Sequence, residues 1–282
     1  MDLAELLKVA EAAVARGRAV TESMAPGVLT SKGDRDMASE VDFAVEREVR
    51  AFLERETPDL GVLGEEEGGA TDGTRWVLDP IDGTVNFVHG VPLWAISLGL
   101  IHEGRAVAGV IDHPALNTTY VGAEGLGATC NGKPIRGSEC TELSEALVAV
   151  GDYAVGPDAA KVNADRVALT QQLFPRVQRL RMIGTAATAL TWTANAYFDA
   201  LIMFSNKPWD TMAGVAICRE AGVTVLDLDG TEHAPESRGV FAVSSGLKDQ
   251  LLDLLVDVAD HEEHAAEDRD HVRDHGAGEQ RG

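Results

Sequence analysis

The sequence has few cysteines and few basic residues. Its three cysteines, Cys130, Cys140 and Cys218, are odd in number and form no CxxC pair. We therefore expect no disulfide framework and a reducing compartment. Lysine and arginine together number 24, against 46 aspartate and glutamate residues, and the net charge is -22. This balance argues against a nucleic-acid-binding protein, because a phosphate backbone requires a basic surface.

Long apolar runs are also missing. No stretch of about 18 uninterrupted apolar residues occurs, so no membrane span is expected. The N-terminus carries acids where a signal peptide would be basic, and Glu5, Lys8 and Glu11 interrupt any apolar core there. We therefore expect a cytoplasmic protein. Its 282 residues, 45% of them apolar, suffice for one large α/β domain or two closely packed halves.

The apolar pattern predicts mostly helices at the start of the chain and strands after it. Apolar residues at three- and four-residue steps predict helices from Leu3 to Val14 and from Asp42 to Leu53, joined by a polar loop from Ser31 to Asp36. Short apolar runs predict the strands that follow: 61–64, 75–78, 94–101, 106–111, 119–122 and 127–135. Within the last of these runs, Asn131-Gly132 is a strong hairpin signal.

After residue 146 strands and helices alternate, which predicts α/β layering. The expected strands are 147–150, 200–204, 223–226 and 240–243, and the expected helices are 159–173, 185–196, 210–221 and 247–258. We divide the chain into an N-terminal half (1–146), a C-terminal half (147–259) and a tail (260–282). The tail is acidic and rich in histidine, with Val272 as its one large apolar residue, so we expect it to be disordered.

The segment Asp79-Pro80-Ile81-Asp82-Gly83-Thr84 places two carboxylates three residues apart at the end of an expected strand. The proline fixes its own φ and biases Asp79 toward extended backbone, so both side chains and a carbonyl can aim at one point. Gly83 lets the backbone approach a ligand, and Thr84 can begin a helix whose N–H groups face an anion. Mg²⁺ requires oxygen ligands of this kind. An Asp-Gly turn that caps a helix is the alternative.

Three further acidic features are weaker when taken alone. Glu65-Glu66-Glu67 also follows an apolar strand, so two neighbouring strand ends would bring Glu65 or Glu66 beside Asp79, although a solvated turn is the simpler interpretation. Asp210 opens an apolar helix, where an N-cap role is the alternative. Asp42 lies on an amphipathic helix, where a surface acid is the default.

Taken together, these segments resemble the inositol monophosphatase family. The resemblance rests on Gly64-Glu65-Glu66, on the segment from Trp76 to Gly90 and on the segment from Pro208 to Gly214. It extends from about Leu3 to about Val258. The resemblance implies a layered αβαβα fold, commonly a homodimer, and a phosphomonoesterase that uses two or three Mg²⁺ ions with no nucleic acid or membrane as partner.

The resemblance also implies roles for individual residues. The first metal would be held by Glu65, Asp79 and the Ile81 carbonyl, the second by Asp79, Asp82 and Asp210, and a third would touch Glu65. Thr84, in contact with Asp42, would orient the attacking water. Backbone N–H groups of Gly83 and Thr84 would bind the phosphate. The expected substrate contacts are Asp82, Gly184, Thr185, Ala186, Met203 and Asp210.

Met203 departs from the family pattern. Inositol-phosphate enzymes of the family have a glutamate seven residues before the equivalent of Asp210, where it contacts sugar hydroxyls. A methionine cannot accept a strong hydrogen bond from a polyol, and an unpaired polar group is costly. The substrate alternatives are therefore an inositol monophosphate, a 3′-phosphoadenosine 5′-phosphate, histidinol phosphate, fructose 1,6-bisphosphate or a specialised-metabolite phosphate. A catalytically silent homologue that binds a metal or an anion is the remaining alternative.

Overall fold

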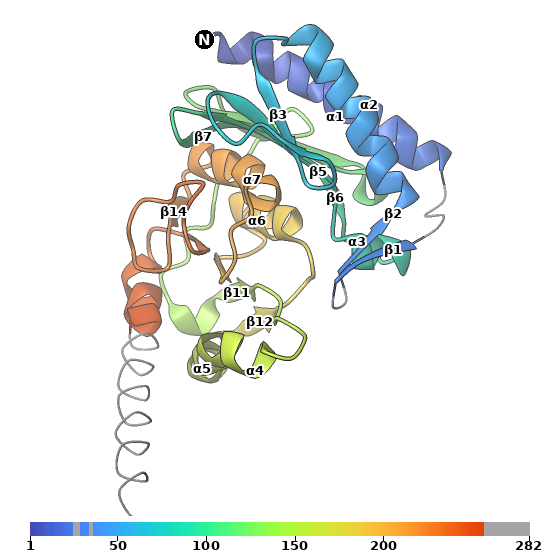
Figure 1. Ribbon diagram of the computed structural model, residues 1–282. Coiled ribbons are helices and arrows are strands. Elements are labelled where there is room, and N and C mark those ends of the chain that lie inside the picture. The colour runs from blue at the N-terminus through green and yellow to red at the C-terminus, as the bar shows by residue number, and fades with distance from the viewer. Residues whose placement is uncertain (25–28, 34–35, 257–282) are drawn as a thin grey trace, which may run out of the picture.

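The computed structural model describes residues 1–24, 29–33 and 36–256. Helices and sheets alternate in five layers, as Figure 1 shows from the helical pair α1 and α2 to the helices α4 and α5 on the opposite side. Three buried apolar clusters fill the spaces between these layers. The expected αβαβα sandwich is therefore confirmed. Among the described residues, no helix has the length and apolar character needed to cross a membrane.

The first layer consists of α1 (Leu3–Ser23) and α2 (Glu40–Glu56). Asp2 caps α1, because its carboxylate accepts the N–H groups of Ala4 and Glu5. At the start of α2, Ser39 and Asp42 form a capping box. Both helices pack their apolar faces on the first sheet. Asp42, expected as a surface acid by default, is fully buried at this cap.

The first sheet has eight strands in the order β10-β9-β8-β7-β6-β5-β3-β4. Its strands are β3 (Gly61–Gly64), β4 (Gly68–Gly69), β5 (Arg75–Asp82), β6 (Ala95–His102), β7 (Arg105–His113), β8 (Thr118–Ala123), β9 (Gly127–Cys130) and β10 (Lys133–Pro134). The short helix α3 (Thr84–Val88) follows β5, and 3₁₀ turns cover Pro114–Leu116 and Leu143–Glu145. The turn at Asn131-Gly132 joins β9 to β10, as the sequence predicts.

The segment expected as a polar loop forms a hairpin instead. Strands β1 (Leu29–Gly33) and β2 (Asp36–Ser39) pair with each other in antiparallel register. The prediction of a loop was therefore wrong for residues 31–33 and 36, whereas residues 34 and 35 lie outside the described residues. Antiparallel pairing rests on backbone hydrogen bonds, which do not require the apolar alternation on which the sequence prediction relied.

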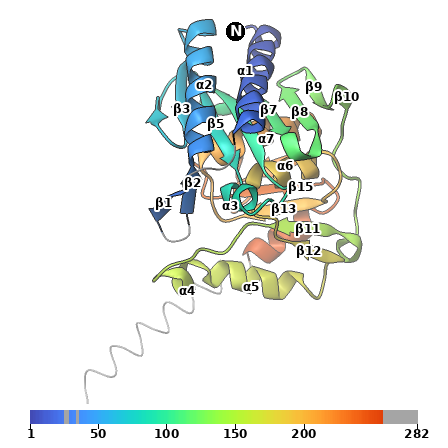
Figure 2. The ribbon, with the colours of Figure 1, turned by 90° about the vertical axis from the view of Figure 1, so that its right-hand side faces the viewer.

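The middle layer consists of α6 (Ala186–Ala194) and α7 (Pro208–Glu220), which lie between the two sheets (Figures 1 and 2). Small residues permit this close packing. A Cβ on Gly99 of β6 would lie 2.8 Å from the backbone nitrogen of Ala213, and one on Gly109 of β7 would collide with the same residue. The N-terminus of α7, which carries Asp210, thereby lies against the first sheet.

The second sheet has the order β12-β11-β13-β15-β14. Its strands are β11 (Leu147–Val150), β12 (Arg179–Arg181), β13 (Ala200–Met203), β14 (Thr224–Leu226) and β15 (Val240–Val243). The outer layer comprises α4 (Ala159–Val162), α5 (Ala164–Leu173) and a helix over residues 248–256. The expected tail, 260–282, lies outside the described residues.

Two details of this half differ from the sequence prediction. The single helix expected from Ala159 to Leu173 is divided at Asn163, whose side chain bonds to both the N–H and the carbonyl of Ala154. Asparagine competes in this way with helical hydrogen bonds. Strand β12 was not predicted, because its Arg-Leu-Arg sequence at the sheet edge has one apolar residue.

Candidate active site

Two parallel strands bring acidic residues together at their carboxyl ends. Gly64 of β3 pairs with Leu78 of β5, and the N–H of Glu65 donates to the Leu78 carbonyl at 3.1 Å. Glu65 therefore follows β3 directly beside Asp79. The prediction that two neighbouring strand ends bring Glu65 beside Asp79 is therefore confirmed.

A bulge in β5 turns the next part of the acidic segment toward the second half of the chain. Asp79 pairs with Ser97 and Asp82 with Ala95, so the register shifts by one residue between them. The Asp79 carboxylate accepts the N–H of Ile81 at 3.0 Å and closes a tight turn around Pro80. Asp82 then reaches the N-terminus of α6, where it accepts the N–H groups of Ala186 and Ala187 and the hydroxyl of Thr185.

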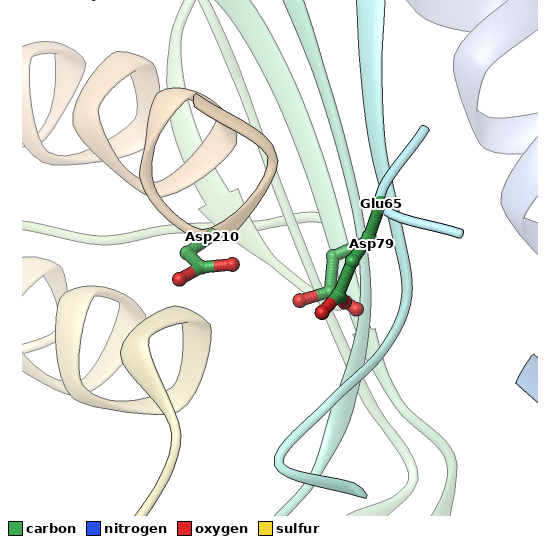
Figure 3. A group of neighbouring side chains, drawn as sticks. All are labelled: Glu65, Asp79 and Asp210. Carbon is green, nitrogen blue, oxygen red and sulfur yellow. The ribbon is translucent and has the colours of Figure 1, made fainter. Parts of the chain in front are cut away.

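A third segment completes the acidic group. Asp210 lies in the first turn of α7, and Figure 3 shows it facing the adjacent carboxylates of Glu65 and Asp79. One carboxylate oxygen from each of these residues lies within 4.8 Å of the others. Segments 145 residues apart in the sequence, at Glu65 and Asp210, thus converge on one point. Asp82 borders the same space, although its carboxylate is turned toward α6.

Burial and mutual repulsion make this group electrostatically strained in the absence of a cation. Asp79 is almost fully buried, and burial followed by the charges of Glu65, Asp82 and Asp210 raises its pKa well above the ordinary value. Burial also raises the pKa of Asp82, to about 6, although hydrogen bonds from Thr185, Ala187 and Ala186 oppose the shift. Both shifts mean that, without a compensating positive charge, the ionised forms of Asp79 and Asp82 are disfavoured in the folded protein.

The residues present fit a hard divalent cation. Carboxylate oxygens are the ligands that Mg²⁺ and Ca²⁺ prefer, and three of them meet here from separate elements. A cation would remove the repulsion that raises the pKa of Asp79. No cysteine or histidine belongs to the group, which disfavours a structural zinc site.

Thr84 and Asp42 form a dyad beside the acidic group. The Thr84 hydroxyl lies 3.1 Å from Asp42 Oδ1 and 3.1 Å from the Ile81 carbonyl oxygen. Asp42 Oδ2 accepts the Ser39 hydroxyl and, at 2.9 Å, the Ser39 N–H. Burial raises the pKa of Asp42, and the hydrogen bonds from Ser39 and Thr84 oppose this shift. The dyad thus joins a fixed carboxylate to a hydroxyl at the cavity wall.

Two neighbouring cavities adjoin these residues and share part of their lining. The first, of about 260 Å³, is lined by Glu65, Asp79, Ile81, Gly83, Thr84 and Lys207, among others. The second, of about 190 Å³, is lined by the expected substrate contacts Gly184, Thr185, Ala186 and Met203. Asp82 and Asp210 line both cavities. All the predicted site residues except Asp42, which lies buried behind Thr84, therefore line one or both of two cavities that share wall residues.

The comparisons with known proteins agree with this arrangement. The family model described as "Inositol monophosphatase family" matches residues 2–260. A probable inositol 1-monophosphatase, ImpA, from Mycobacterium tuberculosis is 37% identical over 242 residues, which are 85% of this chain and 89% of that protein.

The chain belongs to the inositol monophosphatase family. Members of this family are phosphoric monoester hydrolases, so the chain is an enzyme of that class. A fructose-1,6-bisphosphatase/inositol-1-monophosphatase from Thermotoga maritima is 34% identical over 81% of this chain and 86% of that protein. Among solved structures, an IMPase from Thermotoga maritima superposes with a TM-score of 0.80 at 28% identity, covering 93% of this chain and 99% of that one.

In this member of the inositol monophosphatase family, the buried carboxylate of Glu46 supports the turn that carries Glu65. Glu46 of α2 accepts the N–H groups of Glu66 and Glu67 at 2.8 and 3.0 Å. Arg50 donates to the same carboxylate at 2.7 Å, and a Cβ on Gly64 would collide with it. The sequence analysis did not identify Glu46, because a single glutamate on an amphipathic helix resembles a surface residue.

A polar network supports Asp82 from the other side. The Thr185 hydroxyl donates to Asp82 and lies 3.0 Å from the Thr188 hydroxyl. Thr188 in turn lies 3.4 Å from Nδ1 of His113, whose Nε2 lies 3.1 Å from the Thr191 hydroxyl. Burial lowers the pKa of His113 to about 4, so this imidazole is neutral near pH 7. Hydroxyls buried on α6 thus orient a carboxylate of β5.

Sequence analysis also missed Asp152, which lines both cavities. It follows strand β11 by two residues, and a position just after an apolar strand is the same signal that drew attention to Glu65 and Asp79. Asn86 was likewise not singled out. Its side chain donates to the carbonyls of Leu93 and Ile183 at 2.8 Å each and so ties α3 to the segment that carries Gly184.

Proposed function

We propose that this protein is a Mg²⁺-dependent phosphomonoesterase that acts on a small phosphorylated metabolite of the inositol monophosphate kind. The observation that carries the proposal is the approach of carboxylate oxygens from Glu65, Asp79 and Asp210 to within 4.8 Å of one another beside a cavity. The intact acidic set and the neighbouring threonine also argue against a silent homologue, which would be expected to have lost one of them.

In this proposal Glu65, Asp79 and the Ile81 carbonyl hold one Mg²⁺, and Asp79, Asp82 and Asp210 hold a second. A third, looser ion contacts Glu65. Mg²⁺ in such a site lowers the pKa of water and neutralises charge on the leaving oxygen. Asp82 would need to offer an oxygen to the cavity while keeping its bonds to α6, and two carboxylate oxygens with four lone-pair sites permit this.

The chain's own groups position the nucleophile. Thr84 donates its hydroxyl proton to Asp42, which leaves the oxygen of Thr84 free to accept a hydrogen bond from the attacking water. As the water attacks phosphorus, its proton passes to Thr84 and the Thr84 proton to Asp42. Because burial raises the pKa of Asp42, its carboxylate is a stronger proton acceptor than an exposed aspartate.

Backbone N–H groups hold the phosphoryl oxygens in this account. Gly83 and Thr84 begin α3, and the first N–H groups of a helix have no intrahelical acceptor. Gly83 has a φ of 90°, and a Cβ there would lie 3.1 Å from the Leu93 carbonyl oxygen, so the turn requires glycine. Gly184, Thr185, Ala186 and Met203 would then border the alcohol part of the substrate.

Phosphate release from 4-nitrophenyl phosphate, with and without Mg²⁺, tests the proposal. We expect turnover that requires millimolar Mg²⁺ and is lost after chelation and in Asp79→Asn. A panel of inositol 1-phosphate, 3′-phosphoadenosine 5′-phosphate, histidinol phosphate and fructose 1,6-bisphosphate then identifies the substrate class. A well-folded protein that releases no phosphate from any of these esters would contradict the proposal and favour a silent homologue.

We also propose a cytoplasmic homodimer. The family resemblance supports the homodimer, and the three cysteines, which are free in the described structure, support a reducing compartment such as the cytoplasm. Light scattering at micromolar concentration is expected to give twice the mass of 29.9 kDa. A monomer mass would contradict the proposed dimer without affecting the proposed activity.

A further inference from the structure

Asp152 is an acidic residue at the cavity that the proposed chemistry does not use. It lies two residues after the end of β11, which runs parallel to β13. Val150 pairs with Ile202, and a Cβ on Gly151 would lie 3.2 Å from Met203 Cγ. The loop after β11 therefore carries Asp152 to the wall of the cavity that Met203 also lines.

The Asp152 carboxylate has no partner among the described residues. No hydrogen bond or ion pair joins it to any side chain or backbone group in 1–24, 29–33 or 36–256, whereas Asp42, Asp79 and Asp82 all accept hydrogen bonds. Although Asp152 is open to solvent, partial burial raises its pKa. An uncompensated carboxylate at a cavity wall can be stabilised by a positive charge on a ligand.

The charges around this cavity favour a cation at that end of the substrate. The charged residues that line the 190 Å³ cavity are Asp82, Asp152 and Asp210, and no lysine or arginine is among its described lining residues. Lys207 lines the neighbouring cavity, where the phosphate is proposed to bind. If Asp82 and Asp210 are neutralised by Mg²⁺, Asp152 remains as the negative charge that faces the alcohol part of the ester.

We propose that Asp152 is a specificity-determining residue and that the substrate is a phosphate ester of an alcohol that carries a positively charged amine. The ammonium group pairs with the Asp152 carboxylate while the apolar walls formed by Val150, Leu201 and Met203 contact the carbon chain. This inference rests on the proposed phosphatase activity but departs from the inositol-type substrate, because inositol carries no amine.

An amine suits this position better than the other groups that a metabolite could present. A hydroxyl can donate one hydrogen bond to Asp152 but leaves its charge uncompensated, whereas an ammonium group donates and also neutralises it. A second phosphate would be repelled by Asp152 and would find no basic side chain among the described lining residues of this cavity. Bisphosphates are therefore expected to be the poorest esters.

Matched linear esters test the proposal. We would measure kcat/KM with Mg²⁺ for 2-aminoethyl, 3-aminopropyl and 4-aminobutyl phosphate, for the monophosphates of the diols of equal length, and for the corresponding bisphosphates. At the chain length that reaches Asp152, kcat/KM for the amine ester is expected to be about tenfold higher than for the diol ester of equal length. This is the typical effect of one charge-assisted hydrogen bond at a partly open site.

Substituting the carboxylate should act in opposite directions on the two kinds of charged ester. Asp152→Asn is expected to lower kcat/KM for the amine about tenfold and to raise it for the bisphosphate, while Asp152→Glu retains part of the amine preference. Asp158→Asn is the matched control, because Asp158 is exposed in the same loop and does not line either cavity. This control should leave the preference unchanged.

Three results would overturn the inference: no amine preference at any chain length, a preference that survives Asp152→Asn, or an equal loss on every ester in that variant. Release of 4-nitrophenol from its phosphate by the unaltered protein, measured in parallel, separates these results from a failure of the proposed activity. Turnover of the aryl ester without amine preference overturns the role of Asp152 alone, whereas absence of turnover on all esters overturns the proposed function as well.

Discussion

The Oγ1 atom of Thr84 lies 3.1 Å from Oδ1 of Asp42, a carboxylate buried in the first turn of α2. The two residues are 42 positions apart, and the capping box of α2 fixes the carboxylate that the hydroxyl contacts. One aspartate thus caps a helix and contacts the hydroxyl that the proposed mechanism uses. A structural role and a role in proton transfer can be separated by substitution.

Asp42→Asn is expected to lower kcat about 100-fold to 10,000-fold with little change in KM, because a neutral amide cannot accept the proton that Thr84 passes on. Thr84→Ser should retain much of the activity and Thr84→Val little. Steady-state kinetics on 4-nitrophenyl phosphate measures these effects. Glu40→Gln, on the exposed side of the same turn, is the control and should behave like the unaltered protein. Full turnover in Asp42→Asn would refute the dyad.

Glu46→Gln is expected to destabilise the fold by about 3 kcal/mol, because it removes the buried charge that pairs at 2.7 Å with the partly buried Arg50 guanidinium. It should also weaken Mg²⁺ binding, since Glu46 holds the turn that carries Glu65. Urea unfolding with and without Mg²⁺ measures both effects. Glu48→Gln removes an exposed ion pair with Arg16 and should cost less than about 1 kcal/mol. Equal effects of the two substitutions would contradict the supporting role of Glu46.

Thr185→Val keeps the shape of the side chain but removes the hydroxyl that caps α6 and donates to Asp82. We expect a loss of about 1 kcal/mol from the cap and a reduction of about 10-fold to 100-fold in Mg²⁺ affinity from the freed carboxylate. Thr193→Val is the matched control, because the buried Thr193 hydroxyl bonds to the Ala189 carbonyl within α6. A Thr185→Val protein with unchanged Mg²⁺ affinity would show that this network does not orient Asp82.

The raised pKa of Asp82 predicts a pH-dependent effect of Asp82→Asn. The folded value is about 6 and the ordinary value 3.8. Above pH 6 the ionised carboxylate therefore lowers the free energy of unfolding. Below pH 3.8 the group is protonated in both the folded and the unfolded state and does not affect stability. Metal-free Asp82→Asn should melt at a higher temperature than the unaltered protein at pH 8, and the difference should shrink as the pH falls below about 6.

Saturating Mg²⁺ should reverse this order at pH 8, because the cation stabilises the protein that keeps its carboxylate and binds the variant weakly. Thermal unfolding at pH 5 and pH 8, with Mg²⁺ and with chelator, covers the four conditions. A metal-free variant that melts below the unaltered protein at pH 8 would contradict the assignment of strain to Asp82.

Much of the site could be predicted because its residues follow apolar strands or open apolar helices. Glu65 after β3, Asp79 in β5 and Asp210 at the start of α7 each carry a local signal of this kind. Local signals do not give the relative positions of segments, so the approach of Asp210 to Asp79 followed only from the family resemblance. The structure adds the close packing of Ala213 on Gly99 and Gly109, which holds α7 against the first sheet.

Other residues could not be predicted because their roles depend on distant partners. Glu46 has no charge pattern that separates it from Glu48 on the same helix, yet Glu46 is fully buried and the side chain of Glu48 is 43% exposed. Asp152, like Asp79, follows a run of apolar residues. However, no turn motif in the sequence predicts that its side chain reaches the cavity. The strands β1 and β2 lack apolar alternation, so the sequence gives no signal for their pairing or its register.

The central claim is that carboxylates from three distant segments form one site for divalent cations. Isothermal titration of Mg²⁺ into metal-free protein, compared between the unaltered chain and Asp210→Asn, tests it most directly. We predict saturable binding at millimolar or lower concentration in the unaltered protein and a loss of at least one ion in the variant. Absence of binding, or equal binding by both proteins, would contradict the account.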